Sequence, residues 1–147
     1  MLVHATTTKR RKTGGYSLLE ILIVLGIIAL LAAVVGPRLL GYFDKAKSQT
    51  TGLEMDNVKS AVGLFFVDTG RYPSNEEGLG ALFEAPAGSS GWDGPYLESR
   101  DALTDAWARP YLYRTPADDY AFEIKSLGRD GAEGGEGEDA DLVARSL

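Results

Sequence analysis

The sequence contains no cysteine and a single histidine among 147 residues. Without cysteine, the chain can form no disulfide bond, thiolate metal site or thiol nucleophile. The single histidine, His4, lies at the extreme N-terminus, which excludes a histidine-based catalytic triad and a metal site of several histidines. We therefore do not expect an enzyme. A membrane-anchored hydrolase or binding protein is the alternative from another functional class.

Charge is unevenly distributed along the chain. Residues 1–15 carry four basic side chains and no acid, so the net charge of −6 leaves −10 on the remainder. The four are Lys9, Arg10, Arg11 and Lys12. An acidic body of this kind argues against nucleic-acid binding. A basic leader before an acidic body is typical of a protein whose N-terminus stays in the cytoplasm while the rest is exported.

A long apolar segment follows the basic residues. As a helix, Tyr16–Pro37 would span about 33 Å, close to the roughly 30 Å hydrocarbon thickness of a bilayer. A cleaved signal peptide, a twin-arginine export signal at residues 10–11 and a plain membrane anchor are three ordinary explanations. None of them accounts for Glu20, the one charged residue between Lys12 and Arg38.

Glu20 needs a positively charged partner. A carboxylate in lipid costs about 2.5–3.5 kcal/mol and is normally paired. Cleavage after Gly15 would create a suitable cation, because the freed α-amine of Tyr16 would lie about one helical turn from Glu20. In an assembly of staggered parallel helices, the amine of one subunit would neutralise the carboxylate of its neighbour.

Residues 15–20 read GYSLLE and resemble the class III signal of type IV pilins and pseudopilins. In that signal a glycine, an aromatic residue and an acid precede an apolar helix, and this chain departs from it only by conservative replacements. The resemblance implies a leader peptide over residues 1–15, cleaved after Gly15 by a prepilin peptidase. It also implies N-methylation of Tyr16 and a role for Glu20 in assembly.

The helical pattern continues beyond the membrane segment. Apolar residues recur at helical spacing between charged ones. We expect one long helix with a transmembrane and assembly half at 16–37, an amphipathic half at 38–70 and an end at Gly70. Pro37 either kinks the helix at the membrane boundary or lets it bend in a fibre. The expected core-facing residues are Leu39, Phe43, Ala46, Thr50, Leu53, Val58, Val62 and Phe65, with Leu40, Leu64 and Phe66 widening the stripe.

Residues 71–147 hold too little apolar material for a core of their own, so we expect them to fold onto the helix. A capping box of Ser74 and Glu77 predicts a short helix. Strands are predicted at 111–115 and 120–125, joined by a turn, in an antiparallel element. The second strand should direct Tyr120, Phe122 and Ile124 to the core and Glu123 and Lys125 to solvent. The expected fold class is α+β.

Four segments of the body restrict the resemblance to one family among the pilins and pseudopilins. Residues 70–73 read GRYP, 94–97 read GPYL, 105–113 read DAWARPYLY and 126–131 read SLGRDG. They resemble, in the same order, the GRYP, GPYL, DPWGNPYQY and SLGADG segments of the major pseudopilin of type II secretion systems. In the third segment, two alanines replace the Pro and the Gly of the family pattern. The C-terminal residues 142–147 depart from that pattern, and their packing is not predicted.

The resemblance implies a type IV pilin-like fold and a structural subunit that assembles with its own copies into a helical fibre. Minor pseudopilins, the prepilin peptidase, the inner-membrane platform of the secretion system and membrane lipid would be its partners, without nucleic acid. The N-terminus would be cytoplasmic and the body periplasmic, on a single pass through the inner membrane. A type IV pilin for adhesion or motility is the alternative, but such pilins commonly carry a C-terminal cysteine pair, which this chain lacks.

Residues 127–142 combine six acids with several glycines. Composition alone favours a disordered acidic tail, but oxygen ligands on a flexible backbone also suit calcium. The resemblance implies a structural calcium ion. The implied ligands are the side chains of Asp130, Asp139 and Asp141 and the backbone carbonyls of Leu127 and Ala132. Whether Glu138 or Asp139 is the ligand stays open, because it depends on how the glycines align.

Overall fold

A computed structural model describes residues 15–146, and the chain divides into two units, Met1–Leu39 and Leu40–Leu147. Most of the predicted leader, residues 1–15, lies outside the described residues. The leader therefore stays a prediction. Helix α1, Leu18–Thr69, contributes to both units.

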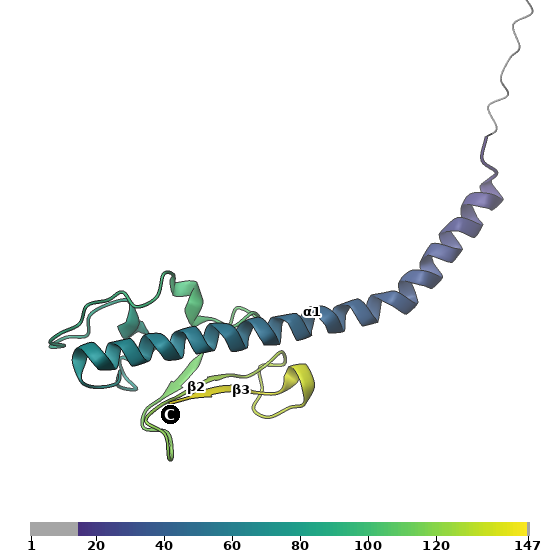
Figure 1. The fold of residues 1–147 in the computed structure, drawn as a ribbon. Coiled ribbons are helices and arrows are strands. Elements are labelled where there is room, and N and C mark those ends of the chain that lie inside the picture. The colour runs from purple at the N-terminus through teal and green to yellow at the C-terminus, as the bar shows by residue number, and fades with distance from the viewer. Residues whose placement is uncertain (1–14, 147) are drawn as a thin grey trace, which may run out of the picture. The chain divides into compact units, whose positions relative to one another are not determined.

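Helix α1, Leu18–Thr69, confirms the predicted long helix (Figure 1). Pro37 lies inside it. Proline lacks a backbone donor and disfavours the helix interior, yet the helix continues on both sides of this residue. The helix ends as predicted at Gly70, whose amide donates to the carbonyl of Phe66 at 2.8 Å.

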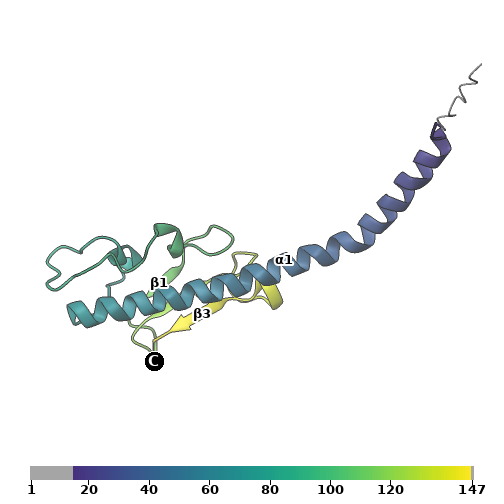
Figure 2. The same cartoon turned by 45° about the horizontal axis from the view of Figure 1, so that its top comes forward.

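A three-stranded antiparallel sheet lies against the second half of α1 (Figures 1 and 2). Its strands are β1, Leu112–Arg114, β2, Glu123–Ser126, and β3, Leu142–Arg145, in the order β1-β2-β3. The register pairs Tyr113 with Ile124 and Ile124 with Ala144. The first two strands confirm the prediction, although both are shorter. The third strand was not predicted, and it forms from the C-terminal residues that depart from the family pattern.

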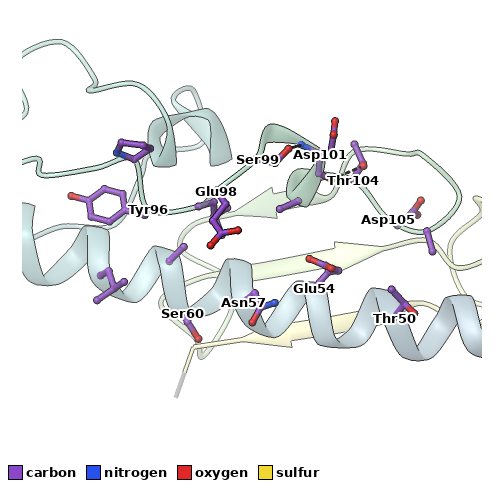
Figure 3. A pocket seen from close by; sticks show the side chains of 16 residues that line it. Thr50, Glu54, Asn57, Ser60, Tyr96, Glu98, Ser99, Asp101, Thr104 and Asp105 are labelled. Atoms are coloured by element: carbon purple, nitrogen blue, oxygen red, sulfur yellow. Dashed lines mark hydrogen bonds between the residues drawn. The ribbon is translucent and has the colours of Figure 1, made fainter.

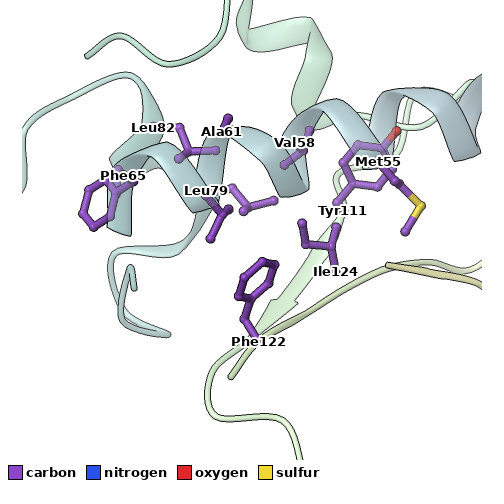
Figure 4. Packing of buried hydrophobic residues seen from close by; sticks show 11 residues of the cluster. Met55, Val58, Ala61, Phe65, Leu79, Leu82, Tyr111, Phe122 and Ile124 are labelled. Carbon is purple, nitrogen blue, oxygen red and sulfur yellow. The ribbon is translucent and has the colours of Figure 1, made fainter. Parts of the chain in front are cut away.

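The hydrophobic core forms between the second half of α1 and the body (Figure 4). Its buried members are Met55, Val58, Ala61, Val62, Phe65, Leu79, Ala81, Leu82, Tyr111, Phe122 and Ile124. This confirms that the body folds onto the helix. The predicted helix stripe is right for Val58, Val62 and Phe65. It is wrong for the other members whose burial is described, all of which are exposed: Leu39, Phe43, Ala46, Thr50, Leu53, Leu64 and Phe66. All of these core residues belong to the second unit, so residues 40–147 carry a complete core.

The side chains on the two faces of β2 differ less in burial than predicted. Phe122 and Ile124 are buried as expected, whereas Tyr120 is largely exposed. Glu123 was predicted to face solvent but is 7% exposed. The reason is the unpredicted neighbour β3, because Arg145 Nε donates to Glu123 Oε2 at 2.7 Å and its side chain lies over the carboxylate.

The predicted capping box is present at the first turn of the body. The amide of Glu77 donates to Ser74 Oγ at 3.2 Å, and the amide of Ser74 donates to Glu77 Oε2 at 2.8 Å. The helix that follows, Gly78–Leu82, is of the 3-10 type. Gly78 has φ of +56°, outside the right-handed helical region, which interrupts an α-helix directly after the box.

Candidate functional site

The predicted cleavage and assembly residues of the N-terminal segment are exposed. Gly15 and Tyr16 lie before the first turn of α1 and are exposed. Glu20 lies in that first turn, where a carboxylate interacts favourably with the helix N-terminus. Glu20 is also exposed. The predicted cleavage bond is therefore accessible, and Glu20 is free to meet a group on another molecule.

The first unit exposes a continuous apolar helix surface. Among residues 15–146, α1 is the one helix long and apolar enough to cross a membrane, judged by length and composition. Its large apolar side chains between Leu18 and Val35 are all exposed. A surface of this size, uncovered within the chain, is typical of a segment that meets lipid or other helices.

The acidic loop, residues 127–142, is closed by its own backbone. The amide of Arg129 donates to the carbonyl of Glu138 at 2.9 Å, and that of Asp141 donates to Gly134 at 3.0 Å. Gly128 has φ of +63°, and a Cβ there would lie 2.6 Å from the carbonyl oxygen of Ala140. The loop thus has a defined conformation that depends on glycine, which argues against a disordered tail.

The structure places the three predicted carboxylate ligands in different surroundings. Asp130 Oδ1 accepts a hydrogen bond from the amide of Ala132 at 3.0 Å. Asp139 accepts two from Arg129, at 2.7 and 2.9 Å, and this contact lowers the pKa of the Asp139 carboxyl. Asp141 Oδ2 lies 3.7 Å from Lys125 Nζ, whereas its Oδ1 is buried with no hydrogen-bond partner.

Within residues 15–146, no three acidic or histidine side chains are arranged as a metal-binding group. Both oxygens of Asp139 face a guanidinium. Of the two predicted carbonyl ligands, that of Leu127 accepts from the amide of Gly131 at 3.2 Å, and Ala132 is exposed. Three of the six loop acids, Glu133, Asp139 and Asp141, therefore lie beside basic side chains.

Sequence reasoning missed these basic side chains as part of the loop. Lys125 Nζ lies 3.7 Å from both Glu133 and Asp141, and Arg129 also donates to Asp44 of α1 at 3.1 Å. Arg129 was visible in the sequence as the base inside the acidic run. Its partner Asp44 was not, because the two are 85 residues apart.

A groove of about 1160 Å³ lies between α1 and the loop at 95–106 (Figure 3). Its lining includes the carboxylates of Glu54, Glu98 and Asp101 and the hydroxyls of Ser60 and Ser99. The body contains no histidine or cysteine. The groove therefore offers no nucleophile with a histidine base.

Two family profiles match adjacent parts of the chain. The profile described as "Prokaryotic N-terminal methylation motif" matches residues 10–36. The profile described as "Type II secretion system (T2SS), protein G" matches residues 38–145, well over half of the sequence. The chain belongs to the type II secretion system protein G family. The first profile spans Gly15, Tyr16 and Glu20, the residues on which the predicted signal depends.

Individual proteins of the protein G family show the same likeness over nearly the whole chain. Type II secretion system core protein G of Xanthomonas campestris pv. campestris is 38% identical over 144 residues, covering 97% of this chain and 98% of that protein. The Pseudomonas aeruginosa protein of the same name is 36% identical, with 91% and 96% covered. The crystal structure of the major pseudopilin from the type 2 secretion system of enterohaemorrhagic Escherichia coli is similar with a TM-score of 0.57. That match has 30% sequence identity and covers 73% of this chain and 93% of the other. The resemblance predicted from the sequence is confirmed.

Proposed function

We propose that this chain is the structural subunit of a type II secretion pseudopilus, which polymerises to drive protein export across the outer membrane. The observation that carries this function is the exposed apolar half of α1 with Glu20 as its one acid, in a chain of the protein G family. An apolar helix with a single unpaired carboxylate is costly in lipid as a monomer. Packing against copies of itself provides both the apolar partner and the counter-ion.

The counter-ion arises by processing. A prepilin peptidase cleaves after Gly15 and methylates the new N-terminus at Tyr16. The α-amine of Tyr16 then neutralises Glu20 of the next subunit and sets the axial stagger between neighbouring helices. The exposure of Gly15 and Tyr16 ahead of α1, and the matching methylation motif, support this assignment.

Membership of this family supports a structural rather than a catalytic role, and assembly with other pseudopilins in the inner membrane. Minor pseudopilins and the inner-membrane platform are the partners that this role requires. The basic residues 9–12 keep the N-terminus in the cytoplasm, and the acidic body lies in the periplasm. No observation favours the alternative of a type IV pilin for adhesion or motility.

Calcium is the proposed ligand of the acidic loop. The donor types suit a hard cation, because every proposed ligand atom is a carboxylate or carbonyl oxygen and Asp141 Oδ1 is buried without a hydrogen-bond partner among the described residues. Asp130, Asp139 and Asp141 would supply carboxylates, and Leu127 and Ala132 carbonyls. A bound ion would neutralise acids that repel one another. Calcium should therefore raise the melting temperature of the body, and chelation should lower it.

The assembly proposal is tested by Glu20→Gln in the full chain. Glutamine has nearly the same volume but no charge, so the variant should enter the membrane and be cleaved after Gly15. It should fail to form fibres and should abolish export of the secreted substrates, because the subunit amine loses its partner. Fibres are measured by chemical cross-linking and immunofluorescence, and the mature N-terminus by mass spectrometry.

The matched control is Glu76→Gln, which removes an exposed acid of the body that takes part in no observed hydrogen bond or ion pair of the described residues. It should assemble normally. Fibre formation and export by Glu20→Gln at the level of the control would refute the proposed role of Glu20. A mature N-terminus other than Tyr16 would refute the proposed processing.

A further inference from the structure

Arg129 joins two acids from distant parts of the sequence. Its Nε and Nη2 donate to the two carboxylate oxygens of Asp139 in the acidic loop, at 2.7 and 2.9 Å. Its Nη1 donates to Asp44 Oδ2 on α1 at 3.1 Å. Both acids lie in the second unit, so one guanidinium links the loop to the helix within a single folded body.

Two further loop acids share one basic partner. Lys125 Nζ lies 3.7 Å from both Glu133 and Asp141, on opposite sides of the loop sequence. Arg109 donates to the carbonyl of Gly128. Arg129 within the loop and the side chains of Lys125 and Arg109 from outside it therefore contact loop atoms. Arg129 and Lys125 meet carboxylates that would otherwise repel one another.

The Arg129 contact has the geometry of a strong ion pair. Isolated surface pairs stabilise proteins little, but a two-pronged arginine–carboxylate pair within a network is the exception. The side chains of Asp139 and Asp44 are only 31% and 23% exposed. Their partial burial leaves less solvent to screen the contact.

We infer that Arg129 is an internal counter-ion that closes the acidic loop onto α1 and competes with a bound divalent cation for Asp139. This inference rests on the proposed calcium function for the competition alone, since the closing contact is made by protein side chains. It assigns to Arg129 a positioning role: it holds a cation-binding loop in its closed form and ties that loop to α1.

The competition follows from the shared oxygens. Arg129 occupies both oxygens of Asp139, and a cation bound by that carboxylate would lie beside a guanidinium of like charge. Binding must therefore displace Arg129 from Asp139. Arg129 would keep its contact with Asp44, so residue 129 stays tied to α1 while its contact across the loop to Asp139 is broken when the cation is bound.

The test compares Arg129→Gln with Arg100→Gln in the full chain in detergent micelles. Arg100 also pairs with a carboxylate, that of Glu84, and both of those side chains are highly exposed and contact no residue of the acidic loop. Both substitutions remove one positive charge, so the change in net charge is matched. Melting temperature in chelator and the midpoint of a calcium titration, followed by calorimetry, are measured for each.

Arg129→Gln should melt at a lower temperature than the control in chelator, because the loop loses its counter-ion. It should bind calcium with a midpoint about tenfold lower than the control, a size common for coupled sites. A second variant, Asp44→Asn, leaves every loop acid intact. It should lower the melting temperature in chelator while shifting the calcium midpoint much less than Arg129→Gln.

Two results would overturn the inference. A melting temperature of Arg129→Gln in chelator equal to that of Arg100→Gln would refute the counter-ion role. An equal or higher calcium midpoint would refute the competition. If the wild-type chain binds no calcium, the proposed calcium function and the competition both fail, whereas a lowered melting temperature of Arg129→Gln in chelator would still support Arg129 as the counter-ion.

Discussion

The carboxylate of Asp105 accepts a hydrogen bond from the hydroxyl of Ser126 at 2.8 Å, and both residues are buried. The other carboxylate oxygen accepts from the amides of Trp107 and Arg109, both at 2.9 Å. One side chain thus shapes the turn at 105–110 and fastens it to β2. This turn forms the start of the segment DAWARPYLY, residues 105–113, so its first residue has a structural role.

Asp105→Ala should destabilise the body by about 3 kcal/mol, because it leaves buried donors without an acceptor. Chemical denaturation of residues 40–147, followed by circular dichroism, measures the loss. Asp101→Ala is the matched control, since Asp101 is exposed in the adjacent 3-10 helix, Arg100–Leu103, and should change stability by less than about 0.5 kcal/mol. Similar losses for the two variants would contradict the role of Asp105.

The ion pair between Arg71 and Glu77 predicts an acid dependence of stability. Arg71 donates to both Glu77 oxygens at 2.6 and 2.8 Å, and this contact, together with the Ser74 amide, lowers the pKa of Glu77 from about 4.5. A carboxyl whose pKa is lower in the folded state stabilises the fold above its unfolded pKa. That stabilisation is lost as the pH falls through the folded pKa.

The measurement is the difference in melting temperature between wild type and Glu77→Gln as a function of pH. The difference should be constant above about pH 5 and should shrink as the pH falls below about 4.5. In acid, protonation of Glu77 removes from the wild type the same negative charge that the substitution removes from the variant. Glu76→Gln serves as the control, with a small difference at every pH. A difference that does not shrink in acid would show that the pair contributes nothing to stability.

Local patterns predicted much of the fold. The apolar run and helical spacing gave α1 and its end at Gly70, and the Ser74–Glu77 spacing gave the capping box. These features depend on residues within a few positions of one another, so the sequence displays them directly. The 3-10 geometry after the box escaped prediction, because it depends on the positive φ of Gly78, which glycine permits but does not require.

Features that depend on distant residues could not be predicted. Strand β3 has too short and mixed a sequence to be recognised, and it forms because β2 offers a free edge. The burial of Glu123 follows from Arg145 on that unpredicted strand. In the acidic loop, the ligand types were visible, but the link from Arg129 to Asp44 depends on the tertiary fold.

The replacement of the family glycine by Ala108 has a structural consequence that a single substitution can test. Ala108 has φ of +62°, in the left-handed region, where a residue with a Cβ costs about 1–2 kcal/mol. Glycine removes that cost. It also raises the conformational entropy of the unfolded chain, and this destabilises the folded state by about 0.4–1 kcal/mol. The first effect is larger, so Ala108→Gly should stabilise residues 40–147 by about 0.5–1 kcal/mol.

Ala87→Gly is the matched control for this last substitution. Ala87 is exposed in a loop and is not among the described residues with positive φ, so glycine brings only the entropic loss there and should destabilise by about 0.4–1 kcal/mol. Opposite signs for the two variants in chemical denaturation are the expected outcome. If both destabilise to the same extent, the turn at Ala108 is relaxed and the glycine of the family pattern serves some purpose other than backbone conformation.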